Sequence, residues 1–163
     1  MIKAQEFKDI VSRFPTGVTI ITCSFKGKLY GFTANSFASV SLDPPLILFC
    51  IAKSSGSYEA FMNAEHFAVN FLASNQEDIA KHFASRAVDK FADIDFTINP
   101  SGLPLLNESL GYIENSKYDI HDAGDHSIIL GKVIAGEIDK VAPALTYHDR
   151  KFGSNPNAHQ KNF

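Results

Sequence analysis

The residue types best suited to binding chemistry gather between positions 30 and 57. Small residues that can form hydrogen bonds come first, at positions 33–36, and an apolar run at 46–51 follows across a Pro-Pro break. Beyond that run, residues 53–57 offer a cation and hydroxyl groups. A planar ring with a polar rim and a phosphate tail needs both kinds of surface. The pattern therefore suggests a bound group of the flavin mononucleotide type.

The first polar segment, residues 31–36, has two interpretations. One is a strand with a few exposed polar side chains, and the other is a strand edge that hydrogen-bonds the rim of a planar ligand. Ala34 would let a ring approach the backbone, while Asn35 and Ser36 can both donate and accept hydrogen bonds. The residues alone leave both interpretations open.

The second polar segment, residues 53–58, follows the end of a predicted strand. Serines and a glycine there could aim hydroxyl and N–H groups at a phosphate. The alternative is an ordinary loop that caps the next helix, and the Walker A pattern is absent. A second cation for the same phosphate could come from Lys81, Arg86 or Lys90, although each alone is typical of a solvated surface charge.

Two histidines and two aspartates lie within six residues, at positions 121–126. A metal site would need a further cluster of ligands, and no HExxH pattern is present, so none is expected. A polar hairpin turn is the simplest interpretation. The remaining one is that His126 faces a ligand as a hydrogen-bond donor.

A last polar segment, residues 145–152, brings aromatic, imidazole and guanidinium groups together. Tyr147 and Arg150 would suit a dinucleotide, by stacking and by pairing with phosphate. No arrangement of a nucleophile with a base stands out elsewhere in the chain. This favours chemistry that a cofactor carries out.

A mainly β fold must position these segments. Runs rich in Val, Ile, Thr and aromatic residues predict strands, and short amphipathic stretches between them predict helices. No fixed-period repeat and no GxGxxG loop is present. The pattern predicts a small antiparallel barrel with a few short helices. The predicted strands are 17–25, 29–37, 46–52 (fully buried), 66–72 (alternating), 112–121 and 127–138, and the predicted helices are 4–12, 57–63 and 75–83, with 86–95 irregular and 121–126 a turn.

Length and composition fit one domain. The 163 residues suffice for a sizeable core, and 45% apolar and 20% charged residues are ordinary globular values. The net charge of −3 argues against general binding to nucleic acid or anionic membranes. The longest apolar run, residues 46–52, is far too short to span a bilayer. We expect neither nucleic acid nor membrane as a partner.

The cysteines and the chain ends complete these expectations. Cys23 and Cys50 form no CxxC pair and lie in apolar, strand-like runs, so both are expected to be reduced and buried. The N-terminal residues lack the apolar stretch of a signal peptide, and a cytoplasmic location is expected. The polar residues 154–163 predict a flexible tail after a domain of residues 1–153.

Taken in order, the segments closely resemble the short-chain flavin reductase family, the reductase components of two-component monooxygenases. The resemblance covers about residues 5 to 153, and its central motif and its GDH motif together are specific. The matching stretches are FPTGVTIIT (14–22), GFTANSFASVSLDPPLILFCIAKSS (31–55), HFAS (82–85), GDHSIILGKV (124–133) and LTYHDRKFG (145–153).

The resemblance implies an FMN-binding split barrel, an antiparallel Greek-key barrel that is usually a homodimer with the flavin near the subunit interface. It implies reduction of FMN or FAD by NADH or NADPH, through hydride transfer. The reduced flavin would then pass to a partner monooxygenase. No side chain is expected to act as a catalytic acid or base, and His126 would orient the nicotinamide.

The resemblance also implies roles for individual residues of this chain. The isoalloxazine ring would contact Thr33, Ala34, Asn35 and Ser36. Its edge would run along the backbone of Cys50, Ile51, Ala52 and Lys53. The ribityl phosphate would meet Ser54, Ser55 and Ser57, closed over by Phe83, Ala84, Ser85 and Arg86. The nicotinamide nucleotide site would be lined by His126, Tyr147 and Arg150.

Two departures from the family pattern leave points open. Lys90, followed by Phe91, could supply the phosphate cation in place of Arg86. Asp149 stands where a neutral residue or glycine is common, which leaves the preferred nucleotide undecided. Two other functions also remain: a flavin- or haem-binding split barrel without turnover, and an enzyme resembling pyridoxamine-phosphate oxidase, which the reductase-type motifs disfavour.

Overall fold

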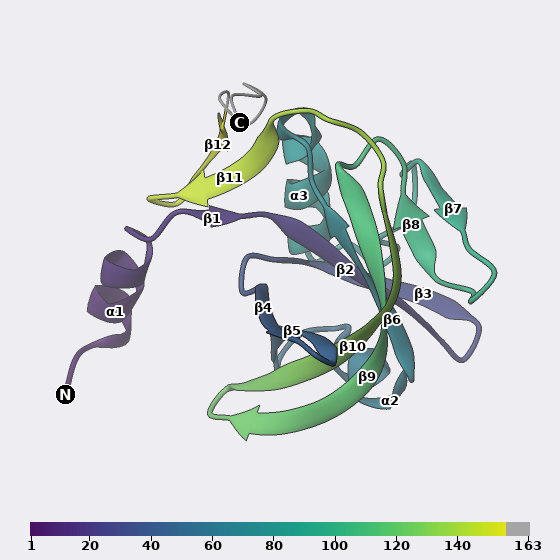
Figure 1. Ribbon diagram of the computed structural model, residues 1–163. Helices are drawn as coiled ribbons and strands as arrows, with labels where there is room; N and C mark the ends of the chain where they lie inside the picture. The colour runs from purple at the N-terminus through teal and green to yellow at the C-terminus, as the bar shows by residue number, and fades with distance from the viewer. Residues whose placement is uncertain (156–163) are drawn as a thin grey trace.

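A computed structural model of the chain describes residues 1–155. Its main body is a seven-stranded antiparallel sheet that curves round on itself (Figure 1). The strand order is β3-β2-β6-β9-β10-β5-β4, so β3 and β4 are the edge strands. The predicted mainly β split-barrel class is confirmed. The strand bounds are β2 Thr19–Phe25, β3 Lys28–Ala34, β4 Ala38–Leu42, β5 Pro45–Ala52, β6 His66–Phe71, β9 Gly111–Ala123 and β10 His126–Ile138.

Two small sheets extend this body. Strands β1 (Thr16–Gly17), β11 (Ala144–His148) and β12 (Lys151–Asn155) form one antiparallel sheet in the order β1-β11-β12. Strands β7 (Phe96–Ile98) and β8 (Pro104–Leu106) form the other. The first sheet places the β11–β12 turn beside the N-terminal helix (Figure 1).

Short helices connect the strands. Helix α1 (Ala4–Val11) has no buried residue and stands away from the barrel (Figure 1). Helix α2 (Tyr58–Asn63) buries Ala60 and Phe61. A 3₁₀ turn, η1 (Ser74–Gln76), leads into α3 (Glu77–Ala84), which buries Phe83 against β3. Among the described residues, no helix has the length and apolar character needed to cross a membrane.

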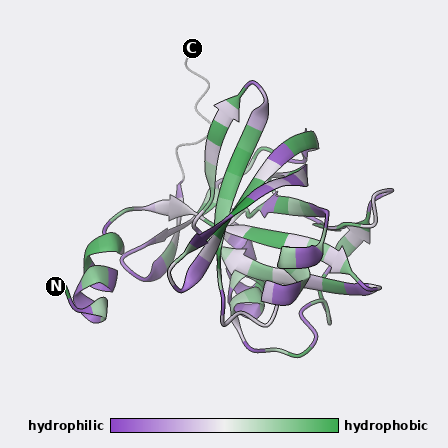
Figure 2. Ribbon diagram, turned by 90° about the horizontal axis from the view of Figure 1, so that it is seen from below, coloured by the Kyte–Doolittle hydropathy of each residue, from purple (hydrophilic) through white to green (hydrophobic). Residues whose placement is uncertain are grey.

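Phenylalanines build the barrel core. The ring of Phe49 lies 5.0 Å from that of Phe67 and 5.9 Å from that of Phe61, centroid to centroid, in edge-to-face contacts. Such contacts add to the free energy gained by burying the rings. Figure 2 shows hydrophobic residues along the strands, while α1 carries both hydrophobic and hydrophilic residues. The core thereby absorbs much of the chain's high phenylalanine content.

Most predicted elements are confirmed, and two errors concern the strands that flank the site. The predicted strand 29–37 ends at Ala34, and β4, a strand that we did not predict, begins at Ala38. The chain leaves the ladder because the hydroxyl of Ser36 bonds the backbone of Cys50, accepting from its N–H (3.0 Å) and donating to its carbonyl (3.2 Å). Strand 46–52 is not fully buried, since Cys50 and Ala52 are half-buried and line a cavity.

Further corrections concern burial and the chain end. Burial in β6 does not alternate, because Ala68 on its second face packs against Leu103 and Leu105. The turn predicted at 121–126 shrinks to the two residues between Ala123 and His126. Residues 154 and 155 of the predicted tail belong to β12, and 156–163 lie outside the described residues. Residues 86–95 form no helix or strand, as predicted.

Candidate flavin and nucleotide site

A cavity of about 1330 Å³ lies beside β3. Edge strand β3 contributes one wall, residues 54–57 contribute one end, and the chain from the end of α3 to Phe91 contributes the other side. An edge strand leaves alternate N–H and C=O groups without a ladder partner, as binding the rim of a planar ring requires. Of the predicted site residues, the cavity is lined by Thr33, Ala34, Asn35, Ser36, Cys50, Ala52, Ser54, Ser55, Ser57, Phe83, Ala84, Ser85, Arg86, Lys90 and His126.

Within residues 33–36, Asn35 has the side chain best placed for a ligand. The hydroxyl of Thr33 donates to the carbonyl of Ala80 on α3, 2.6 Å away, and that of Ser36 is engaged with Cys50. The Asn35 side chain is exposed and forms no hydrogen bond with the described residues. It also lines two neighbouring cavities, of about 810 and 1090 Å³. Asn35 therefore lies where three cavities meet.

The serine-rich end of the cavity divides into structural and available hydroxyls. The buried Ser57 donates to the carbonyl of Gly31, 3.3 Å away, and so joins this loop to β3. The Oγ of Ser55 accepts from the N–H of Ser57 at 3.3 Å. Ser54 is exposed and its hydroxyl has no partner among the described residues. Ser54 and Ser55 thus each have a hydroxyl proton available to a phosphate, whereas that of Ser57 is already donated.

Of the three candidate phosphate cations, Lys81 lines the cavity of about 810 Å³, and Arg86 and Lys90, which line the larger one, differ in their surroundings. The Nζ of Lys90 donates to the carbonyls of Phe83 (3.0 Å) and Ser85, and so caps the C-terminus of α3. Burial lowers the pKa of Lys90. Arg86 is exposed, lines the cavity, and forms no ion pair or hydrogen bond with the described residues. Of these two cations, Arg86 has the guanidinium that is available for a ligand, while Lys90 holds the helix end.

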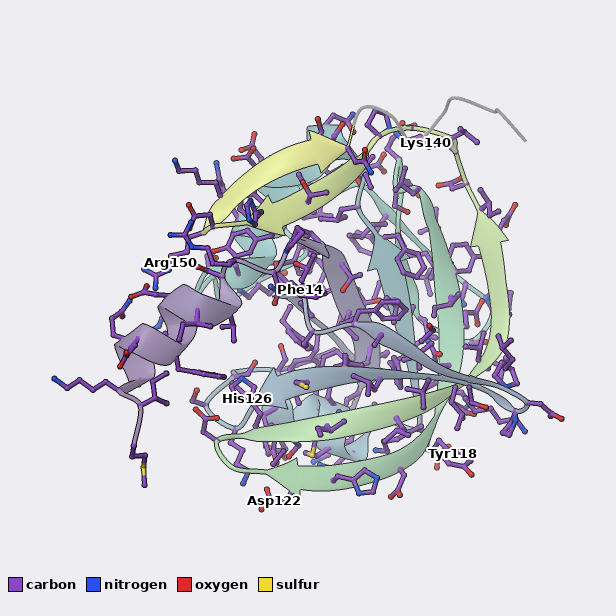
Figure 3. All side chains as sticks on the ribbon, turned by 60° about the vertical axis from the view of Figure 1, so that its left-hand side comes forward. Phe14, Tyr118, Asp122, His126, Lys140 and Arg150 are labelled. Carbon is purple, nitrogen blue, oxygen red and sulfur yellow. The ribbon has the colours of Figure 1, made fainter. Side chains whose placement is uncertain are left out.

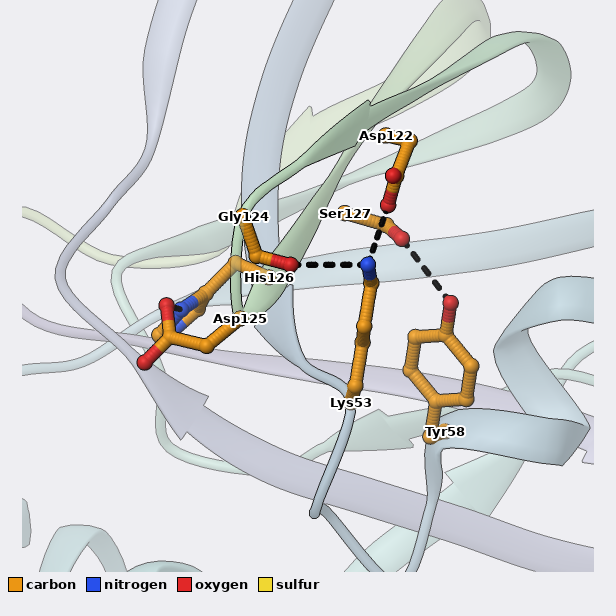
Figure 4. A network of polar contacts seen from close by, with 7 residues as sticks. All are labelled: Lys53, Tyr58, Asp122, Gly124, Asp125, His126 and Ser127. Atoms are coloured by element: carbon orange, nitrogen blue, oxygen red, sulfur yellow. Dashed lines mark hydrogen bonds and ion pairs between the residues drawn. The ribbon is translucent and has the colours of Figure 1, made fainter.

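Lys53 does not line the cavity, because both of its donors bond the β9–β10 turn (Figure 4). Its N–H donates to the carbonyl of Asp125 at 3.0 Å, and its Nζ donates to that of Gly124 at 2.7 Å. The Nζ also pairs with Asp122, and that hydrogen bond raises the pKa of Lys53. Lys53 therefore fastens the turn to the end of β5. Ile51, also predicted at the flavin edge, is buried in the core and does not line the cavity.

The fastened turn carries His126, which lines the cavity. Figure 3 places His126 at the tip of the β9–β10 hairpin. The Nδ1 of His126 lies 2.7 Å from Oδ1 of Asp125, and this contact lowers the pKa of the Asp125 carboxyl. A carboxylate at Nδ1 favours a proton on that nitrogen and thereby orients the ring. Within the described residues, no group of three or more His, Cys, Asp or Glu side chains is placed to hold a metal ion.

The cavity of about 810 Å³ joins the first cavity along β3 and α3. Two of the three residues predicted to line the nucleotide site, Tyr147 and Arg150, line this cavity, whereas the third, His126, lines the larger one. The ring of Tyr147 lies 5.2 Å from that of Phe152. Lys151 and Phe152 line this cavity too and were not predicted as site residues, although both lie in the segment 145–152. The residues that line both cavities are Thr33, Asn35, Ala84 and Ser85.

The model of the flavin reductase like domain matches residues 11–156. The chain belongs to this family. A probable flavin reductase of Rhizobium meliloti is 47% identical over 134 residues, which are 82% of this chain and 43% of that protein. This flavin reductase-like chain thus spans less than half of that relative. The predicted family resemblance is confirmed.

Two further similarities extend over most of both chains. Reductase subunit HsaB of a flavin-dependent monooxygenase from Rhodococcus jostii is 42% identical over 156 residues, covering 95% of this chain and 80% of that protein. The NADH:FAD oxidoreductase of Streptomyces globisporus, solved in complex with NAD and FAD fragments, has a TM-score of 0.89 at 31% identity. The match covers 99% of this chain and 99% of the oxidoreductase.

Proposed function

We propose that this protein is an NAD(P)H:flavin oxidoreductase that transfers a hydride from NADH or NADPH to FMN or FAD. The observation that carries the proposal is the adjacency of the two cavities, which share Thr33, Asn35, Ala84 and Ser85. Hydride transfer requires the two rings to stack, so their sites must adjoin. The bound flavin supplies the hydride acceptor and the nicotinamide nucleotide the hydride.

The residues of the larger cavity fit a flavin with its phosphate. Edge strand β3 offers backbone groups to the ring, and Asn35 adds a side-chain donor where negative charge would develop. Ser54, Ser55 and Arg86 line the cavity and would hold the phosphate. Lys90 would act indirectly, by holding the end of α3 in place.

Tyr147, Arg150 and His126 would bind the reductant. Tyr147 and Arg150 would take the nucleotide by stacking and by pairing with phosphate. His126 would orient the nicotinamide end, with its ring fixed by Asp125. Because this role concerns only the nucleotide, His126→Ala should raise the KM for NADH far more than it weakens flavin binding. The opposite pattern, in steady-state kinetics and flavin titration, would remove His126 from the nucleotide site.

We further propose that the protein is a homodimer. The cavity of about 1090 Å³ is largely apolar and reaches from Phe14 to Ile138, whose side chains are 74% and 81% exposed. Helix α1 also exposes Phe7 and Ile10. A second copy of the chain would cover these surfaces. Since Asn35 lines this cavity too, the flavin would lie near the interface. Light scattering should show a dimer that Phe14→Ser weakens, and a wild-type monomer would contradict it.

A flavin-dependent monooxygenase is the proposed recipient of the reduced flavin. The support is the similarity to named reductase subunits of such monooxygenases. A cytoplasmic location is proposed as well, because Cys23 and Cys50 are both free thiols. Mixing the protein with a monooxygenase and its substrate should yield hydroxylated product only when NADH and flavin are both present.

A further inference from the structure

Helix α1 is attached to the rest of the described chain at the β11–β12 turn. The guanidinium of Arg150 pairs with the carboxylate of Asp9, and that of Arg13 lies 3.6 Å from the carboxylate of Asp149. The N–H of Asp149 also donates to the carbonyl of Ser12 at 2.8 Å. Figure 3 shows Arg150 beside α1. Because α1 has no buried residue, these polar contacts determine where the carboxylate of Asp9 lies.

The backbone of the turn fixes where the Arg150 side chain begins. Asp149 and Arg150 both have a left-handed backbone, with φ of 49° and 61°. A two-residue hairpin loop with positive φ at both positions matches the twist of the strands that it joins. The paired strands therefore hold Arg150 at the rim of the 810 Å³ cavity.

Arg150 is shared between this cavity and α1. Among the cations that line the cavity, Lys81 already pairs with Glu77 at 2.6 Å, whereas Lys151 has no partner among the described residues. The carboxylate of Asp9, which also accepts a hydrogen bond from Gln5 at 3.0 Å, engages one terminal nitrogen of the guanidinium with which an incoming phosphate would pair. Carboxylate and phosphate compete for the same arginine donors.

We propose that Asp9 is an internal competitor for an anion subsite at Arg150, and that it sets the affinity of this protein for the diphosphate of the nicotinamide nucleotide. The inference rests on the proposed function in that it assigns the nucleotide to this cavity. When the nucleotide binds, its diphosphate takes the guanidinium, with Lys151 as the second cation, and Asp9 is released to solvent. Asp9 thus determines affinity without belonging to the cavity lining.

The size of the effect follows from the exposure of the pair. The side chains of Arg150 and Asp9 are 49% and 57% exposed, so their ion pair contributes little free energy. Removing the competing carboxylate should tighten diphosphate binding by about threefold to fivefold. Raising the salt concentration should shrink the difference, because exposed charges are screened.

The test compares Asp9→Asn with the matched control Asp149→Asn in the full chain. Both variants remove one negative charge near the turn, but only Asp9→Asn frees Arg150. Asparagine also tolerates the left-handed backbone of position 149. Two quantities are measured: the dissociation constant of ADP by calorimetry, and the KM for NADH with saturating FMN. Arg150→Gln and the double variant that combines Asp9→Asn with Arg150→Gln complete a double-mutant cycle.

The expected result is that Asp9→Asn lowers the dissociation constant of ADP about threefold to fivefold, while Asp149→Asn changes it less than twofold. In the Arg150→Gln background, the Asp9 substitution should have no effect. Equal shifts in Asp9→Asn and Asp149→Asn, or a shift that survives Arg150→Gln, would overturn the inference. If the wild type fails to oxidise NADH and yet Asp9→Asn tightens ADP, the subsite stands and the reductase proposal falls.

Discussion

Gly31 and Phe83 are in such close contact that no side chain fits between them. A Cβ built on Gly31 would lie 2.7 Å from Cε1 of Phe83 and 3.3 Å from the carbonyl of Ile21. The distance of 2.7 Å is shorter than real Cβ atoms show to other heavy atoms. The glycine thereby lets α3 lie directly on β3, and both Gly31 and Phe83 line the cavity of about 1330 Å³.

Gly31→Ala should therefore damage both stability and flavin binding. The methyl group must push aside a fully buried Phe83, which should cost about 1–3 kcal/mol of unfolding free energy. The displaced helix end carries Ser85 and Arg86, so flavin affinity should fall several-fold. Thermal unfolding and flavin titration measure the two effects. Gly17→Ala is the control, since nothing lies within 4 Å of a Cβ there; equal effects of the two variants would refute the argument.

Arg86→Gln tests which cation holds the phosphate. Because the guanidinium of Arg86 faces the cavity without a partner among the described residues, its loss should weaken FMN binding about tenfold. Riboflavin, which lacks the phosphate, should bind the variant and the wild type alike. Lys90→Met should instead lower the melting temperature, because it uncaps α3. An Arg86 variant that loses riboflavin and FMN affinity equally would contradict the phosphate role.

Lys53→Met tests the fastening of the β9–β10 turn. Without the bonds to Asp122 and Gly124, His126 should be held less firmly, and the KM for NADH should rise about threefold. Flavin affinity should change little, since Lys53 does not line the cavity. Lys140→Met is the matched control, because it breaks an ion pair with Glu108 that lies outside the cavities. If Lys53→Met raised the KM for NADH by the same factor in a His126→Ala background, Lys53 would not act through His126.

The two cysteines should differ in reactivity towards iodoacetamide. Burial raises the pKa of the Cys23 thiol from 9.0 to about 12, so it should stay protonated and unreactive in the folded protein. Cys50 is half-buried and lines the cavity, so it should react, and FMN should protect it. Mass spectrometry of the single variants Cys23→Ser and Cys50→Ser separates the sites. Labelling of Cys50 at the same rate with and without bound FMN would place the flavin elsewhere.

The raised pKa of Cys23 also predicts how stability changes at high pH. The folded thiol keeps its proton where the unfolded thiol, with a pKa of 9.0, loses it. The stabilising contribution is therefore complete below pH 9 and is lost as the pH rises toward about 12. Urea unfolding across this range should show a decline that is smaller in Cys23→Ser. If the free energy of unfolding declined identically in the wild type and in Cys23→Ser, titratable groups other than Cys23 would cause the decline.

Local sequence was sufficient to predict much of the fold and the cavity wall. β-branched and aromatic runs predicted the main strands, and the segments 31–36 and 54–57 do lie on one cavity, whereas Lys53 lies outside it. Burial was harder to predict, because it depends on what covers each face. The second face of β6 is buried only because Leu103 and Leu105 pack on it.

The roles of charged residues could not be predicted from sequence, because their partners lie far along the chain. Lys53 bonds residues about seventy positions away, at Asp122 and Gly124, so its position after a strand said nothing of its contacts. Arg150 pairs with Asp9, at the opposite end of the described chain. Sequence reasoning identified the segments that carry the site but not which of their side chains are already engaged.

The measurement that tests the central claim most directly is NADH oxidation under air, with and without added FMN or FAD. The account predicts that oxidation accelerates and saturates with free flavin, because the two adjoining cavities bring nucleotide and flavin together. A protein that binds flavin but oxidises neither NADH nor NADPH would contradict the account. It would then be a flavin-binding split barrel without turnover, and the roles given to His126 and Tyr147 would have to be withdrawn.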